Sequence, residues 1–173
     1  MTRRVAGRAR PSRPRRLLDF GGAIGSDPAA AMLVYQAEDI CRTTYDPASR
    51  ILVATWWSMV HEQIRPNLTR QMAQVAAGAR YLIIDVGECR GVPAPDDQAW
   101  FGETVFPAYR AAGLRAMINV VPRSGTARLG ASRWQRTASK FGFDTFDTSD
   151  LAAALDLVAE RYGVRATLEA VST

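Results

Sequence analysis

The 173-residue chain has few of the residues that build disulfide frameworks, metal sites and catalytic triads. It contains two cysteines and one histidine. Two cysteines make no disulfide framework in a domain of this size, and the separation of Cys41 from Cys89 matches no zinc spacing, so both are expected as reduced thiols. A single histidine with scattered carboxylates also argues against a metal centre. The sequence therefore predicts neither a metal nor a cofactor.

Long apolar runs are missing as well. No stretch approaches the roughly 18 to 20 apolar residues that a membrane helix needs, and the N-terminus lacks the apolar centre of a secretory signal. The hydrophobic content of 47% is that of an ordinary globular chain of about one domain. These features predict a cytoplasmic protein without membrane insertion.

Lysine is nearly absent, and the basic charge is unevenly placed. Seven of the 22 basic residues are arginines between positions 1 and 16, where no acid occurs. The remaining 15 basic residues face 17 acidic ones, so the net charge of +5 becomes −2 for positions 17–173. Residues 1–31 are predicted as a disordered arginine-rich arm, or as a segment preceding a true start at Met32. Nucleic-acid binding is not expected.

From Met32 onward, strand-like and helical patterns alternate. Residues 32–57 read as two strands around a turn at 46–49, which makes an antiparallel hairpin. Further strands are expected at 80–86, 114–121 and 141–148. Apolar spacing, first-turn residues and stop glycines predict helices over 60–78, 95–113, 126–140 and, capped by Thr148 or Ser149, up to Gly163.

This order predicts an α/β fold in one domain, residues 32–163, followed by a loose tail at 164–173. The expected sheet is mixed and mainly parallel, with four to five strands, an N-terminal antiparallel hairpin and about four helices. No internal repeat or second domain is apparent.

The middle of the chain carries a family resemblance. It consists of "LIIDV", "PDDQAWFGETVFPAYRAAGLRA" and "INVVPRSG", and its most specific positions are Asp97, Trp100, Phe106, Pro107, Ala112 and Gly113. From about Leu33 to Tyr162, the chain resembles the SpoIIAA-like group of small STAS-type domains. The resemblance implies a four- or five-stranded sheet with helices, no established reaction, and a regulatory, partner-binding or ligand-binding role. Related folds of the CRAL-TRIO type hold lipids, which by analogy points to an apolar ligand.

The sequence departs from this family at its switch. Anti-sigma-factor antagonists with this fold are phosphorylated on a serine at the start of the helix that follows the strand ending in aspartate. Here the loop at 87–95 contains neither serine nor threonine, so the phosphoswitch does not carry over. Asp96 and Asp97 are expected either to stabilise the helix start, by about 0.3–1 kcal/mol each, or to imitate a permanently phosphorylated state.

Two loops at neighbouring strand ends are candidate sites. The first is a partner-binding loop, in which an exposed Trp100 would serve as an anchor, unless it packs in the core. The thiol of Cys89, next to Arg90, would be somewhat acidic and reactive; the alternative is that this loop cysteine has no functional role. The residues of this loop are Asp85, Glu88, Cys89, Asp96, Asp97 and Trp100.

The second loop is a candidate anion site at the start of the helix expected over 126–140. Free backbone N–H groups and two arginines would bind an anion there, or the loop is an ordinary helix cap; it lacks the pattern of a P-loop. Its residues are Arg123, Ser124, Gly125, Thr126 and Arg128.

The leading hypothesis is a non-catalytic regulatory or protein-interaction module that uses both loops to bind a protein partner. The alternative is a domain that binds a small anionic or apolar ligand between sheet and helices. An enzyme using Asp85, Cys89 or His61 is a third hypothesis, and homo-oligomerisation is left open. Trp56 and Trp57 must point to opposite faces of their strand. A pocket lined by one of them and opening near Arg123 would favour the ligand hypothesis, whereas a closed core with an exposed Trp100 would favour the partner hypothesis.

Overall fold

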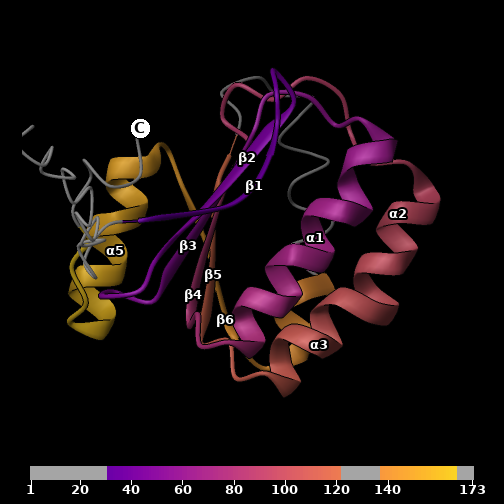
Figure 1. Cartoon of the computed structure of the whole chain (residues 1–173). Helices are drawn as coiled ribbons and strands as arrows, with labels where there is room; N and C mark the ends of the chain where they lie inside the picture. The colour runs from indigo at the N-terminus through magenta and orange to yellow at the C-terminus, as the bar shows by residue number, and fades with distance from the viewer. Residues whose placement is uncertain (1–30, 122–136, 167–173) are drawn as a thin grey trace, which may run out of the picture.

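The computed structural model describes residues 31–121 and 137–166. These residues form an α/β domain, as expected (Figure 1). The elements are, in chain order, β1 (Met32–Ala37), β2 (Cys41–Asp46), β3 (Ile51–Trp56), α1 (His61–Ala76), β4 (Tyr81–Asp85), α2 (Pro95–Trp100), the π-helical turn η1 (Phe101–Val105), α3 (Phe106–Ala111), β5 (Ala116–Val120), the 3-10 turn η2 (Ser139–Phe141), β6 (Asp144–Thr148) and α5 (Leu151–Tyr162).

The strands form one mixed sheet of six, which is more than the four to five predicted. Their spatial order is the chain order, from β1 to β6. β1, β2 and β3 pair antiparallel, whereas β3, β4, β5 and β6 pair parallel. The expectation of a mixed sheet that is antiparallel at its N-terminal edge is therefore confirmed.

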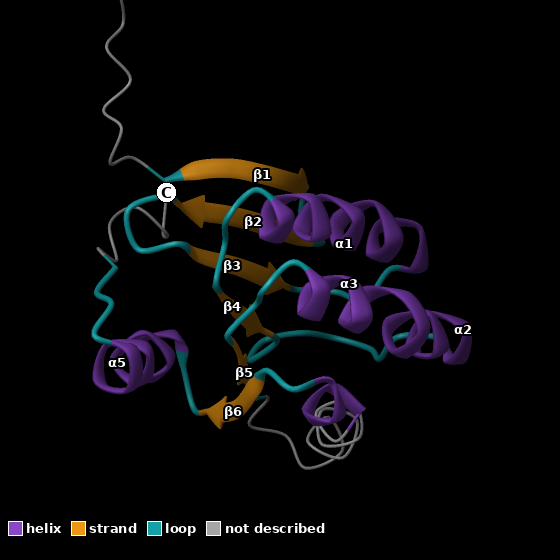
Figure 2. Cartoon of the chain, turned by 90° about the horizontal axis from the view of Figure 1, so that it is seen from below, coloured by secondary structure: helices purple, strands orange, loops and turns teal. Residues whose placement is uncertain are grey.

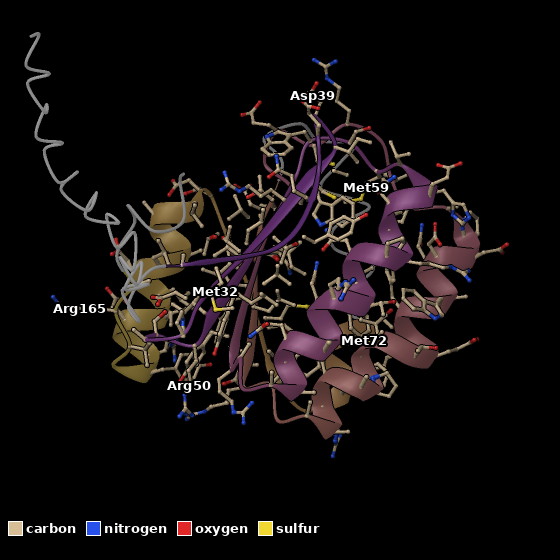
Figure 3. All side chains as sticks on the ribbon, in the orientation of Figure 1. Met32, Asp39, Arg50, Met59, Met72 and Arg165 are labelled. Atoms are coloured by element: carbon tan, nitrogen blue, oxygen red, sulfur yellow. The ribbon has the colours of Figure 1, made fainter. Side chains whose placement is uncertain are left out.

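The N-terminal segment contains three strands, not the predicted two. The turn at 46–49 was predicted correctly: the Oδ1 atom of Asp46 accepts a hydrogen bond from the backbone N–H of Ala48 at 3.0 Å. A second turn separates β1 from β2, and there Asp39 has a φ of 57°. That turn has neither glycine nor proline, and aspartate tolerates the left-handed backbone, so the usual turn signals were missing. Asp39 and Arg50 mark the two turns at opposite ends of the strands (Figure 3).

Helices cover the sheet on both faces (Figures 1 and 2). α1, α2 and α3 lie on one face, and α5 lies against β4, β5 and β6 on the other. Along β3, Leu52 and Ala54 are buried on the α1 side, while Ile51 and Val53 are buried on the α5 side. Because both faces are covered, the central strands read as continuous apolar runs.

One continuous helical run extends from Pro95 to Ala111 through α2, η1 and α3. Its predicted start at Pro95 is confirmed. Pro107 lacks the N–H group that would bond the carbonyl of Glu103, and its ring crowds that carbonyl, so the preceding turn is widened to a π-helix. Sequence periodicity alone did not predict this widened turn, which places Phe101 and Val105 in the core beneath the helix.

α5 begins at a different residue from the one predicted. Its N-cap is Asp150, whose Oδ1 atom accepts a hydrogen bond from the backbone N–H of Ala153 at 2.8 Å. Thr148 and Ser149 were therefore wrong as caps, because the carboxylate lies one residue closer to the helix. The predicted end is confirmed: Gly163 closes α5 with a φ of 69°.

Parts of several predictions fall outside the described residues: the arm at 1–30, the third predicted helix up to position 136, and the tail from position 167. Of the tail, Val164 and Ala166 pack against the core under α5. Across 31–121 and 137–166, no helix is long and apolar enough to span a bilayer.

Candidate ligand-binding site

An apolar cavity of about 90 Å³ lies between the sheet and the layer formed by α1, α2, η1 and α3. It is found at the carboxyl ends of β3 and β4, where open α/β sheets commonly bind ligands. Figure 3 shows Met59 at this end of the sheet, where α1 begins. The lining residues come from β3, β4, α1, the loop at 86–93 and the helical run: Trp56, Met59, Ile64, Leu68, Gln71, Ile84, Val86, Cys89, Gly91, Val92, Pro93, Gln98, Phe101, Val105, Phe106 and Tyr109.

The floor of the cavity follows from strand alternation. Trp56 ends β3 on the α1 side and lines the cavity with Ile84. Its neighbour Trp57 does not line the cavity and is 41% exposed, whereas Trp56 is 4% exposed. Trp56 is therefore the indole that meets the cavity, whereas the opposite orientation of the two indoles stays a prediction.

The helical wall depends on the π-turn. Phe101 and Val105 lie at the two ends of η1, and both line the cavity. π-turns often occur at functional sites because the extra residue redirects side chains. The residues of η1 were assigned to an ordinary helix by their spacing, so this wall was not recognised in the sequence.

A chain of buried hydrogen bonds closes the deep end. The Tyr109 hydroxyl donates to Oε1 of Gln71 at 2.9 Å, and Nε2 of Gln71 donates to Oδ1 of Asn67 at 3.1 Å. Oδ1 of Asn67 also accepts from the Thr43 hydroxyl at 2.7 Å. Four polar side chains thus link β2, α1 and α3, and two of them, Gln71 and Tyr109, also line the cavity. Burial raises the pKa of the Tyr109 hydroxyl far above its ordinary value, so it stays neutral.

The far end of this chain reaches Cys41. Burial raises the pKa of the Cys41 thiol, and the adjacent Asn67 side chain lowers it in part. Nδ2 of Asn67 has no conventional hydrogen-bond partner in the described part of the chain. Asn67 can lower the Cys41 pKa without making a conventional hydrogen bond to it, since a thiol sulfur is only a weak acceptor.

Cys89 lines the cavity, but it is not the acidic thiol considered from the sequence. Burial, and secondarily the negative charge of Asp85, raise the pKa of the Cys89 thiol to about 11. Arg90 does not offset these effects; instead, its carbonyl oxygen accepts a weak hydrogen bond from the Cys89 sulfur at 3.6 Å. Cys89 is therefore a neutral wall residue at physiological pH.

Asp97 joins two helices beside the cavity. Its side chain is fully buried, and its Oδ2 atom lies 2.6 Å from Nδ1 of His61. Oδ1 lies 3.4 Å from Nε of Arg65, whose guanidinium also lies 5.4 Å from the ring centre of Trp100. Trp100 is half-buried. Sequence reasoning placed His61 at a helix start and Asp97 in the next helix, but no signal revealed that they meet.

The other residues of the candidate partner loop do not converge on one site. Asp85 is half-buried, and its Oδ1 atom accepts a hydrogen bond from the N–H of Gly87 at 3.0 Å. Glu88 and Asp96 are exposed. The candidate anion loop, Arg123 to Arg128, lies outside the described residues. Within the described ranges, no cluster of three or more histidine, cysteine or acidic side chains could hold a metal ion.

Comparison of the chain with protein-family models, with curated proteins and with solved structures finds no match.

Proposed function

We propose that this domain is a non-catalytic binding protein that takes up a small molecule in the cavity between the sheet and α1, α2 and α3. The observation that carries the proposal is the apolar cavity floored by Trp56, at the carboxyl end of two parallel strands. Small-molecule sites are typically concave, largely apolar and supplied with a few polar groups. This cavity has that composition, with Gln71, Gln98 and Tyr109 as its amide and hydroxyl groups.

The side chains at the cavity favour binding over catalysis. A general acid or base needs a pKa near the working pH. The Cys89 thiol has a pKa raised to about 11 by burial, and burial raises the pKa of Tyr109 further still. His61 is held by Asp97 and does not belong to the cavity lining.

Native mass spectrometry of the full chain purified from its own host tests this proposal. We expect a small molecule to co-purify with the wild-type chain. Val105→Phe, which places a larger side chain in the cavity, should reduce that occupancy, and Val92→Trp should do so from the mouth, where Val92 is 60% exposed. Trp57→Phe is the matched control, because Trp57 is exposed and does not line the cavity. Equal occupancy in all four proteins would contradict the proposal.

A second candidate function is the STAS-type regulatory module expected from the family resemblance, acting on a protein partner. The observation favouring it is that Trp57 and Val92 both expose apolar side chains, on two loops joined by a hydrogen bond from the backbone N–H of Arg90 to the Trp57 carbonyl at 3.0 Å. The same mass spectra distinguish the two candidates. A protein partner lost with Trp57→Ser but retained with Val105→Phe would support the regulatory module, and retention in both variants would argue against this surface.

A further inference from the structure

The described lining of the cavity has a chemical property beyond its shape: it carries no charged side chain. Its polar members are Gln71, Cys89, Gln98 and Tyr109, and its other members are apolar residues and Gly91. Burial keeps Cys89 and Tyr109 protonated, because it raises the pKa of both groups. Among the described residues, a ligand in this cavity therefore meets neutral groups only.

Three of these four polar side chains already donate a hydrogen bond to the protein. Tyr109 donates to Gln71, and Gln71 donates to Asn67. Nε2 of Gln98 donates to the carbonyl oxygen of Pro93 at 2.8 Å. An anionic ligand would find the second N–H of each amide, a neutral donor that does not replace a counter-charge.

Charged residues next in the chain to lining residues do not themselves line the cavity. Glu88 and Arg90 flank Cys89, but both are exposed. Asp97 precedes the lining residue Gln98, but its carboxylate is buried against His61 and Arg65. Asp85 precedes the lining residue Val86, but its Oδ1 atom accepts the hydrogen bond from the N–H of Gly87. Neither carboxylate lines the cavity, so a cationic ligand finds no counter-ion among the lining residues.

We infer that the cavity selects a neutral, predominantly apolar molecule about the size of one six-membered ring, and rejects carboxylates and amines of the same size. This inference rests on the proposed small-molecule function. A cavity of about 90 Å³ holds several water molecules or one such ring. Burying a charge there without a partner costs far more than the apolar contacts return. One weak polar group on the ligand is compatible with the Tyr109 oxygen, which keeps an acceptor lone pair.

Ligand-observed NMR and calorimetry with three probes test the inference: benzyl alcohol, benzoate and benzylammonium. The probes share one ring and differ in charge. We expect benzyl alcohol to bind the full chain at least about tenfold more tightly than either ion, since one missing charge partner is worth more than 1.4 kcal/mol. Val105→Phe and Val92→Trp should weaken benzyl alcohol binding, whereas Trp57→Phe should leave it unchanged.

The outcomes separate the inference from the proposed function. Benzoate or benzylammonium binding as tightly as benzyl alcohol, and weakened by Val105→Phe, would leave the cavity as a binding site and overturn charge exclusion. Absence of binding by all three probes would overturn the proposed function and the inference together. Because Val105→Phe adds volume to the core, the melting temperature of each variant is measured first, and Val92→Trp provides a second variant at an exposed position.

Discussion

The Nδ1 atom of His61 lies 2.6 Å from the Oδ2 atom of Asp97, and this contact ties the start of α1 to the start of α2. The carboxylate is fully buried, while the imidazole is 56% exposed. An acid that begins a helix would ordinarily interact with the helix dipole and with water. Here it is also a tertiary contact at the edge of the cavity, since the next residue, Gln98, belongs to the lining.

Asp97→Asn should destabilise the domain by about 1–3 kcal/mol, because the neutral amide has one acceptor oxygen instead of two and loses the charge-assisted contacts with His61 and Arg65. Asp96→Asn is the matched control in the same helical turn. Asp96 is exposed and interacts mainly with the helix dipole, so we expect at most about 1 kcal/mol. Urea unfolding measures both, and equal losses would contradict the buried tertiary contact.

Tyr109→Phe should lower the free energy of unfolding by about 1–3 kcal/mol, since it leaves the buried Oε1 atom of Gln71 without its donor. Tyr35→Phe removes a comparable hydrogen bond, from the Tyr35 hydroxyl to Oε1 of Gln63 at 2.6 Å. That bond is only partly buried, so water can replace it, and we expect a loss of about 0.5–1.5 kcal/mol. Thermal and urea unfolding of the two variants provide the comparison. A larger loss of unfolding free energy for Tyr35→Phe would contradict the conclusion that the buried Tyr109–Gln71 bond is the more important of the two.

Cys89 should react slowly with iodoacetamide at pH 8, because its pKa is raised to about 11 and little thiolate is present. The rate should keep rising with pH until about 11, whereas a free cysteine levels off near its ordinary pKa of about 8.5. The unfolded thiol ionises first, so this group contributes stability below about 8.5 that is lost as the pH rises toward 11. Mass spectrometry of the Cys89 peptide follows the alkylation. A rate that levels off below pH 8.5 would show that the thiol is not buried as described.

Trp56→Ala should destabilise the domain by about 3–5 kcal/mol, the usual cost of truncating a buried aromatic side chain. Trp57→Ala is the control next to it in the chain, and its 41% exposure leads us to expect a smaller loss. Acrylamide quenching of the Trp→Phe variants gives a second readout, since removal of Trp57 should reduce the accessible fluorescence more than removal of Trp56. The opposite order would mean that Trp56, not Trp57, is the more exposed indole.

The sequence predicted much of the fold, for reasons visible at particular residues. Buried parallel strands require continuous apolar runs, and "YLIID" and "AMINV" became β4 and β5 as expected. Pro95 and Gly163 specify backbone conformations locally, so the start of α2 and the end of α5 were predicted correctly. The sequence prediction treated β1 and β2 as one strand, because the turn at Asp39 depends on aspartate in a left-handed conformation, which has a weak sequence signal.

The site was less predictable, because its residues meet only through the tertiary structure. The sequence drew attention to Trp56 because it is adjacent to Trp57, and strand alternation required one of the two side chains to face the helices. The sequence could not show that Asp97 is buried against His61, 36 positions away, or that Tyr109 donates to Gln71, 38 positions away. Such contacts depend on how α1 and α3 pack across the sheet, and local propensity contains no information about that packing.

The sequence by itself determined the α/β alternation, the mixed sheet and the apolar character of the core, because backbone geometry and apolar periodicity act over short distances. The tertiary structure alone decided that a cavity remains above Trp56 and that Cys89 is a neutral thiol. Each of these depends on which distant side chains exclude water from a point in space. That is a property of the packed molecule, not of any segment of the chain.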